Sequence, residues 1–280
     1  MKKLFLFGLS LFIVTFILGM ITWFGIEKNN NKVKTIEKQY DINKINRLIV
    51  NSDTADIKVT KGNTFKLVYK GKNKLNISNV DQTLQIAEMS ATSKKMVDVN
   101  PFANHHGSLK IEVPSTKLKE LKLTSNVSNI EVNHINSVNA TLWNEKHGEI
   151  NIDDSQFKST QISGYETFVK ANNSSLTDSE VNIEKGAIDI NSTQVNNSVF
   201  KVVEGMINLK NMPAECVLKA SIKNGDILLH YKDQPHNMML KLNPENGRSI
   251  IKNKNIQNGK NGDGRHKIEL YTTNGDIKVE

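Results

Sequence analysis

Acidic side chains are the first candidates for chemistry in this sequence, because enzymes that cut polysaccharides act through two carboxylates beside the scissile bond. Asp153 and Asp154 are adjacent, but successive side chains of an extended strand face opposite ways, so this pair is more typical of a turn. An aliphatic position recurs along the chain every 19 or 20 residues, and the residue after it is expected to face outward. These outward residues are Glu131, Asn151, Lys170, Asp189, Asn208 and Leu228, and no two consecutive ones are acids. A polysaccharide lyase or hydrolase is therefore the alternative hypothesis and not the leading one.

Two motifs have the residue types of a metal site. His105 and His106 offer imidazole nitrogens, yet no third ligand has a helpful spacing, and paired histidines in a polar loop are usually solvated. Asn261-Gly262-Asp263-Gly264 is similar to a calcium loop but lacks the further Asp and the closing Glu, so we expect a turn. No nucleophile-elbow or phosphate-binding loop is present. We therefore expect no catalytic residue, metal or cofactor, and we expect the single cysteine, Cys216, to be a core residue.

Basic residues form the one cluster that could hold a partner. Without Lys2 and Lys3, 35 of the 37 Lys and Arg remain against 29 Asp and Glu, so residues 27–280 carry a net charge of +6. Aromatic residues are only 6% of the chain, which argues against nucleic acid as a partner. Residues 232–266 are expected to be an irregular excursion whose basic residues contact an anionic surface: Arg248, Lys252, Lys254, Lys260 and Arg265.

The start of the chain indicates where such residues act. Leu4–Ile26 is a 23-residue run without a charged side chain, and as a helix it would be about 34 Å long, enough to cross a bilayer. A cleaved signal peptide has an apolar core of about 7–15 residues and a small-x-small cleavage site, whereas this run ends in Trp23-Phe24-Gly25-Ile26. We predict an uncleaved anchor over residues 1–26 and an extracytoplasmic remainder, with a cleaved signal as the alternative.

An internal repeat positions most of the remaining residues. A Gly or small residue, one further residue and an Ile-x-aliphatic pair recur, and the central aliphatic residues are spaced by 19 or 20 positions: Ile130, Ile150, Val169, Ile188, Ile207 and Ile227. Two other rows of apolar residues recur with nearly the same spacing. One is Trp143, Ile162, Val181, Phe200 and Leu218, and the other is Val138, Phe157, Leu176, Val195 and Ala214. A unit of this size holds two or three short strands and buries its apolar face only against neighbouring copies. The period therefore predicts an all-β fold, a β-solenoid-like stack of short strands behind a single transmembrane helix.

Asparagine is abundant, with 36 copies, and it recurs three residues after the central aliphatic position. Because Asn and Asp tolerate left-handed backbone, stacked turns are the simpler explanation, and a sugar-binding ladder is the alternative. A longer unit with two aliphatic pairs occurs four times, at 48–59, 121–132, 218–229 and 268–279. We expect a juxtamembrane linker at 27–40, a β cap region at 41–117 and a β-repeat region at 118–280, interrupted at 232–266; residues 88–108 are expected to be a second irregular segment.

These motifs resemble a known family. The amino-terminal anchor, the opening Thr54-Ala55-Asp56-Ile57-Lys58-Val59, the glycine-led repeats and the terminal Asn274-Gly275-Asp276-Ile277-Lys278-Val279 are similar to the bacterial putative-adhesin domain family, which includes the membrane-anchored protein of the Lia cell-envelope stress operon. The resemblance covers about residues 40–280. It implies a β-solenoid-like surface domain with no established catalytic residues, and it implies a bacterial source.

The leading hypothesis is a non-enzymatic, membrane-anchored extracytoplasmic protein that presents a binding or signalling surface in the cell envelope. Anionic wall polymer, lipid headgroups and another envelope protein are the partners that its basic residues would suit. Acids that converge in a groove would favour the enzyme, and asparagine turns on a polar face would favour the binding protein.

Overall fold

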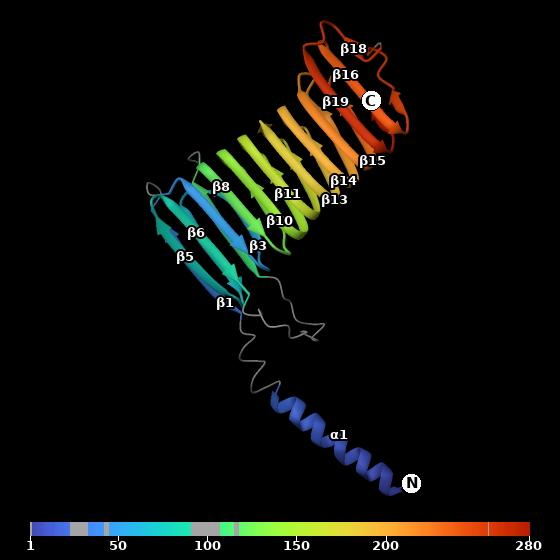
Figure 1. Cartoon of the computed structure of the whole chain (residues 1–280). Coiled ribbons are helices and arrows are strands. Elements are labelled where there is room, and N and C mark those ends of the chain that lie inside the picture. Colours follow the sequence, from blue (N-terminus) through green and yellow to red (C-terminus); the bar gives the residue numbers. More distant parts are fainter. Residues whose placement is uncertain (1, 23–32, 42–44, 91–106, 115–117, 257) are drawn as a thin grey trace.

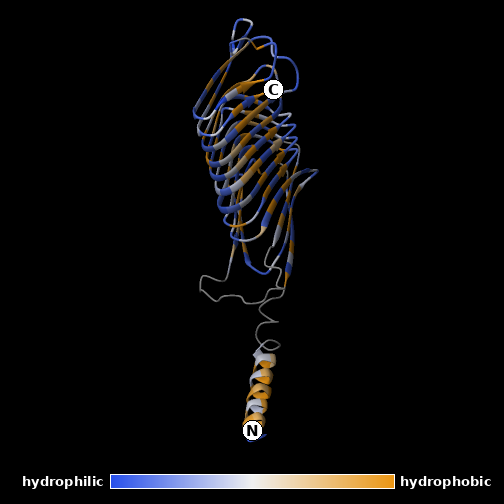
Figure 2. Cartoon of the chain, turned by 90° about the vertical axis from the view of Figure 1, so that its right-hand side faces the viewer, coloured by the Kyte–Doolittle hydropathy of each residue, from blue (hydrophilic) through white to orange (hydrophobic). Residues whose placement is uncertain are grey.

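The computed structural model of the chain describes residues 2–22, 33–41, 45–90, 107–114, 118–256 and 258–280. Within these residues one helix, α1 (Lys2–Thr22), precedes a 20-stranded sheet that winds into a solenoid-like stack, as the repeat predicts (Figure 1). Its coils run side by side from the amino-terminal strands to the carboxy-terminal ones. Hydrophobic and hydrophilic residues alternate along the strands, whereas α1 is mostly hydrophobic along its whole length (Figure 2).

The middle of the stack consists of coils that pair in parallel with their neighbours in sequence. Their strands are β10 (Asn136–Asp153), β11 (Gln156–Asn172), β12 (Ser175–Thr177), β13 (Ser179–Asn191), β14 (Gln194–Met212) and β15 (Val217–Tyr231). Pairing aligns Ile150 with Val169, Val169 with Ile188, and Ile188 with Ile207. The predicted central row is therefore a physical column, one residue from each coil.

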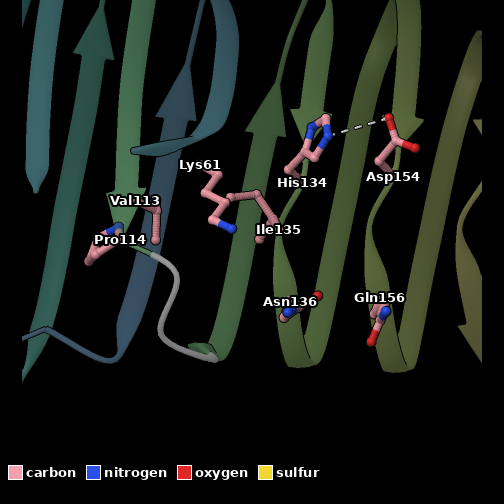
Figure 3. A pocket seen from close by; sticks show the side chains of 8 residues that line it. All are labelled: Lys61, Val113, Pro114, His134, Ile135, Asn136, Asp154 and Gln156. Atoms are coloured by element: carbon pink, nitrogen blue, oxygen red, sulfur yellow. Dashed lines mark ion pairs between the residues drawn. The ribbon is translucent and has the colours of Figure 1, made fainter. Parts of the chain in front are cut away.

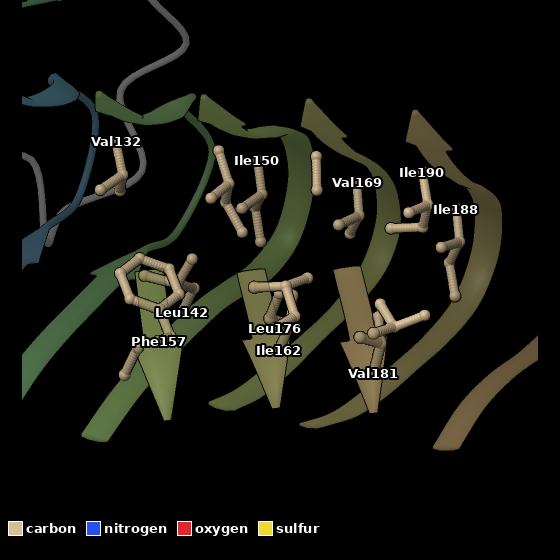
Figure 4. Packing of buried hydrophobic residues seen from close by; sticks show 14 of the residues in the cluster. Val132, Leu142, Ile150, Phe157, Ile162, Val169, Leu176, Val181, Ile188 and Ile190 are labelled. Atoms are coloured by element: carbon tan, nitrogen blue, oxygen red, sulfur yellow. The ribbon is translucent and has the colours of Figure 1, made fainter. Parts of the chain in front are cut away.

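Each coil has two strand runs that enclose a shared core. Ile150, Ile188 and Ile207 are fully buried, which confirms the inward assignment made from the repeat. Ile162 and Val181 face them from the other run (Figure 4). A 19-residue coil therefore buries its apolar side chains partly against the opposite run and partly against the next coil.

Glycine occupies the corner between the two runs because the coils approach closely there. Gly186, Gly205 and Gly225 have φ between 134° and 143°, a backbone conformation that L-residues with a side chain rarely adopt. A Cβ atom on Gly205 would lie 1.7 Å from the carbonyl oxygen of Gly186 in the preceding coil. The glycines that precede the repeat strands are thus required by this contact.

The other end of each coil is a turn in left-handed backbone. The residues with positive φ are His134, Asp154, Asn173, Ser192 and Asn211, which form one column. Next to it, buried hydroxyls link successive coils: Ser155 Oγ accepts from the Ile135 N–H at 3.1 Å, and Ser174 Oγ accepts from the Ser155 N–H at 3.1 Å. These bonds satisfy backbone donors that the core would otherwise leave unpaired.

At the amino-terminal end, the order of coils in space differs from their order in sequence. The strands are β1 (Lys34–Tyr40), β2 (Arg47–Ser52), β3 (Asp56–Gly62), β4 (Phe65–Gly71), β5 (Lys74–Val80), β6 (Thr83–Met89), β7 (Ser108–Pro114), β8 (Leu118–Ser125) and β9 (Ile130–Asn133). The coil formed by β2 and β3 lies between the coil of β8 and β9 and the coil of β6 and β7. Antiparallel strands β5, β4 and β1 then cover this end.

The carboxy-terminal end repeats this arrangement. Its strands are β16 (Met238–Asn246), β17 (Ser249–Ile251), β18 (Lys260–Asn261), β19 (His266–Asn274) and β20 (Ile277–Val279). The coil of β19 and β20 pairs with β15 on one side and with β16 and β17 on the other. The last coil in sequence is therefore inserted before the outermost coil.

Several expectations differ from this structure. Residues 34–40 of the expected linker form β1, which pairs with β4, and residues 238–251 of the expected excursion form the outermost coil. Trp143 is 44% exposed, and Leu142 takes the inward place beside Ile162. The pairing of β10 with β11 shifts register between Asn144 and His147. A constant spacing of 19 therefore placed Trp143, and not Leu142, in the row with Ile162. A second shift, between β14 and β15, pairs Phe200 with Ala220 and not with Leu218.

Candidate functional site

Three outward acids of the stack, Glu131, Glu149 and Asp189, each lie beside a lysine. Lys58 Nζ is 2.6 Å from Glu131 Oε1, and Lys210 Nζ is 2.7 Å from Asp189 Oδ2. Lys170 pairs with Glu149 on the neighbouring coil. Among the described residues, no group of three or more His, Cys, Asp or Glu side chains could hold a metal ion. His105 and His106 lie outside those residues.

Asp154 belongs to the turn column and Asp153 directly precedes it, so the pair marks a turn, as the sequence indicates. Asp153 Oδ1 accepts a hydrogen bond of 2.8 Å from Asn172 Nδ2, and Asp154 has φ of 49°. Asp154 also lines a hollow of about 210 Å³ and lies 3.7 Å from His134 Nε2 (Figure 3). The other lining residues are Lys61, Val113, Pro114, Ile135, Asn136 and Gln156. This His–Asp pair is exposed, and in the described part of the chain no hydroxyl or thiol nucleophile lines the hollow.

Asparagine side chains connect the turns. Asn172 donates to Asp153, Asn191 Nδ2 donates to Asn172 Oδ1 at 3.4 Å, and Asn211 Nδ2 donates to Asn191 Oδ1 at 2.8 Å. Each amide therefore donates to the side chain of an earlier coil. This arrangement supports the interpretation of the abundant asparagines as stacked turns.

The five predicted basic residues all lie exposed at the carboxy-terminal end of the stack. Arg248 is 3.1 Å from Asp276 and Lys252 is 2.7 Å from Glu280; both acids lie in or next to β20. Hydrogen bonds from the backbone and side chain of Arg248 lower the pKa of Asp276, and the hydrogen bond from Lys252 lowers the pKa of Glu280. The structure thus pairs two of the five with acids that the sequence places far away.

The remaining three basic residues differ in their surroundings. Arg265 is 3.0 Å from Asp263, the acid of its own segment. Lys254 and Lys260 make no ion pair with an acid in the described parts of the chain. Residues 238–280 hold eight Lys or Arg against five Asp or Glu, so this end keeps a net charge of +3. This end of the stack is therefore less basic than the segment from Arg248 to Arg265 alone indicates.

A second basic group at this end was missed in the sequence. Lys219 and Lys241 lie over the ring of Tyr271, with Nζ 5.2 Å and 5.6 Å from the ring centroid. Nearby, Lys267 and Tyr271 hydrogen-bond to Glu269 and lower its pKa to about 2. These residues meet because β19 lies between β15 and β16. The 19-residue period carries no signal of that order.

Other expectations about single residues agree with the structure. Gly262 and Gly264, in the segment that is similar to a calcium loop, have φ of 64° and 75°, values typical of turns. Cys216 is buried in the core, and burial raises the pKa of its thiol to about 12.

The fold and these surfaces define a class of protein: an all-β, solenoid-like repeat domain that follows a helix long and apolar enough to cross a membrane. The chain belongs to the Toastrack DUF4097 family, whose pattern matches residues 45–280. This match confirms the resemblance that the repeats indicate.

Solved structures from three bacteria match the chain. A "putative adhesin" from Bacteroides fragilis is 14% identical, with 88% of this chain and 97% of that chain covered and a TM-score of 0.38. A "putative cell adhesion protein" from Clostridium sporogenes is 12% identical over 89% and 99%, with a TM-score of 0.28. A "putative adhesin" from Parabacteroides distasonis is 11% identical over 89% and 98%, with a TM-score of 0.33. No curated protein matches the chain in sequence.

Proposed function

We propose that this chain is a membrane-anchored, non-enzymatic and adhesin-like surface protein of the bacterial cell envelope. Helix α1 holds it in the membrane, and the β-stack stands outside the cytoplasm and presents a binding or signalling surface. The observation that carries the proposal is one chain that joins an apolar helix of spanning length to a Toastrack stack. The pairing of outward acids with lysines supports a binding role over a catalytic one.

The proposed contact surface is the carboxy-terminal end of the stack, around Lys254 and Lys260. Arg248, Lys252 and Arg265 border it, and their partners compensate part of their charge. An exposed group of this kind attracts an anionic partner over a distance of about 10 Å at 0.1 M salt and does not need a shaped pocket. Anionic wall polymer is the partner whose charge fits best, with anionic lipid headgroups and another envelope protein as the alternatives.

Protease accessibility tests the membrane topology. The full chain, with an epitope tag after Glu280, is expressed in bacterial cells, and intact cells whose wall has been removed are treated with a protease. We expect the tag to be lost from intact cells and the chain to stay with the membrane after a salt wash. Protection of the tag until the cells are lysed would contradict the proposal.

Salt-dependent binding tests the contact surface. The full chain in neutral-lipid discs is mixed with wall polymer or anionic vesicles at about 0.05 and 0.5 M salt. We expect binding that weakens with salt and falls when Arg248, Lys252, Lys254, Lys260 and Arg265 are all changed to Gln. A control with the same net charge carries Gln at five exposed lysines elsewhere: Lys38, Lys74, Lys119, Lys122 and Lys158. Binding that ignores salt, or that falls equally in the control, would reject this surface.

A further inference from the structure

One outward column of the stack changes its chemical character in the middle coils. Near both ends, an Asp or Asn in this column accepts the backbone N–H of the next coil. Asn129 Oδ1 accepts from the Glu149 N–H at 2.9 Å, and Asp226 Oδ1 accepts from the Asp276 N–H at 2.7 Å. On β11, β13 and β14 the same column holds Phe168, Ala187 and Met206. Three coils therefore replace a structural hydrogen-bonding residue with an apolar one.

The two large side chains of this column are exposed, and Ala187 is half-buried. Phe168 is 55% exposed and Met206 is 44% exposed, and Ala187 lies between them on the intervening coil. At the neighbouring corner of the same two coils, Tyr165 and Val203 are 50% and 37% exposed. We call Phe168, Ala187 and Met206 the apolar patch; Tyr165 and Val203 lie further towards the corner, with Glu184 between them. Large apolar side chains grouped on an outer face indicate a surface that another molecule covers.

Charged residues border the apolar patch in a definite pattern. On its corner side, β11, β13 and β14 present Glu166, Lys185 and Glu204 in this order. On the opposite side, the same three strands present Lys170, Asp189 and Asn208. On β11 and on β13, the charged residue on one side of the apolar patch therefore has the opposite sign to the charged residue on the other side. On β11 and β13 the flanking charges are thus complementary to themselves, while Glu149 and Asp226 follow the apolar residues of the central column along the stack.

We infer that the apolar patch binds the same patch of a second copy of this chain, with the two stacks side by side and parallel. A two-fold axis along the stack brings each coil against the same coil of the other copy. Glu166 then faces Lys170 of the partner subunit, and Lys185 faces Asp189 of the partner subunit. Ala187 lies near the axis and faces Ala187 of the partner subunit, while Phe168 and Met206 pack on either side of it.

The antiparallel arrangement is disfavoured by the same charges. A two-fold axis along the strands would place Glu166 against Glu204 of the partner subunit, and Lys185 against Lys185 of the partner subunit. Like charges brought together at an interface oppose association. Lys170 and Asp189 also pair within the chain, with Glu149 and Lys210, but exposed ion pairs of this kind contribute little and leave both side chains able to share a partner.

Parallel packing also fits the proposed anchor, and this step alone rests on the proposed function. Both copies then have β1 at the same end of the pair, so both α1 helices can enter one membrane. The apolar patch is small compared with stable interfaces, which bury about 800 Å² on each partner. Confinement to one membrane raises the effective concentration of the two copies and favours a weak contact.

Cysteine cross-linking tests the pairing in the full chain. Ala187→Cys places a thiol near the two-fold axis, whereas the native Cys216 is buried and does not compete. Gln161→Cys, on an exposed position of the other strand run, is the matched control. In membranes treated with diamide, we expect a covalent dimer for Ala187→Cys and about tenfold less for the control. No dimer above the control, or a cross-link to a different protein, would overturn the inference.

A charge exchange tests the orientation. In the Ala187→Cys background, Glu166→Lys or Lys170→Glu alone is expected to reduce the dimer yield by about tenfold, because each makes two like-charged contacts in a symmetric pair. The double variant restores opposite charges and should return the yield to within about twofold. Yields that stay unchanged in the single variants, or a double variant as poor as either one, would reject the parallel arrangement. A chain found in the soluble fraction would contradict the anchor alone, and the cross-link is then measured in that fraction.

Discussion

Glu88 is a carboxylate buried near the amino-terminal end of the stack, where it holds the turn between β2 and β3. Its Oε2 atom accepts from Ser52 Oγ at 2.9 Å, from the Asp53 N–H at 2.8 Å and from the Thr54 N–H at 3.0 Å. Its Oε1 atom accepts from the Thr54 hydroxyl and from Asn73 Nδ2. The side chain thus accepts hydrogen bonds from two backbone N–H groups of this turn.

Glu88→Gln is expected to destabilise the fold by about 2–4 kcal/mol. The amide has one oxygen in place of two, so whichever way it turns, its NH₂ group faces donors. Turned one way it meets the backbone N–H groups, and turned the other way it meets the NH₂ group of Asn73. Hydrogen bonds to a charged acceptor contribute about 1.5–3 kcal/mol each, and at least one is lost together with the burial of an unpaired donor.

The pH dependence follows from the same contacts. Burial by itself raises the pKa of Glu88, but the hydrogen bonds from Thr54, Asn73 and Ser52 outweigh it, so the pKa of Glu88 is lowered in the folded chain. A lowered folded pKa stabilises the fold above the unfolded pKa of about 4.3, and this contribution is lost as pH falls through the folded value. The difference between wild type and Glu88→Gln should therefore be largest at neutral pH and shrink below about pH 4.

Urea unfolding of the full chain in detergent, followed by circular dichroism at several pH values, measures this difference. Glu180→Gln is the control, because Glu180 is exposed and its pKa is also lowered, by Asn182 and Lys201. We expect the control to change stability by about 0.5 kcal/mol or less. Equal effects of the two substitutions, or a difference for Glu88→Gln that is constant with pH, would show that the buried hydrogen bonds do not act as described.

Three further predictions concern the anchor and the repeat. Because the apolar run has no cleavage site, the intact mass of the mature chain should include Met1–Ile26; a mass that begins after residue 20 would contradict this. Ile188→Asp places an unpaired charge in the core and should destabilise the fold by about 4 kcal/mol. Asn208→Ala, on the outer face, should destabilise it by about 0.5 kcal/mol or less. Equal urea midpoints for the two variants would reject the inward and outward assignment. Gly205→Ala should cost about 3 kcal/mol or more because of the contact with Gly186, and Gly259→Ala, where φ is 74° and the nearest atom is 3.1 Å away, should cost about 1 kcal/mol in the same assay.

The sequence predicts the middle of this fold well because one physical rule repeats there. Burial of Ile150, Ile188 and Ile207 imposes alternation along a strand, and the close approach of coils imposes glycine at the corner. Both constraints act at the period of one coil, so they are visible without a structure. The recurrent Asn and Asp residues indicated the turns in the same way, but the left-handed backbone lies one residue further along than they predicted, at His134, Asp154, Asn173, Ser192 and Asn211.

The ends of the stack were not predictable from the period. Leu240 pairs with Ile268, and Arg248 and Lys252 reach acids 28 residues further along the chain. A constant offset of 28 connects all these contacts, but nothing in a 19-residue repeat selects it. The sequence predicted an irregular segment at residues 238–251 because proline and glycine interrupt them. Pro244 is compatible with a strand only because β16 lies at an edge of the stack.

The inserted coil at the carboxy-terminal end has a consequence for the order of folding during synthesis. Strand β15 leaves the ribosome before its permanent neighbour β19 exists, since residues 232–265 must come first. The growing stack therefore keeps an open edge at β15 until the final strands arrive and enter between β15 and β16. Contacts across such long stretches of chain form slowly. The carboxy-terminal end can close only after β20 has been made, so a chain shortened before His266 would keep an adhesive edge.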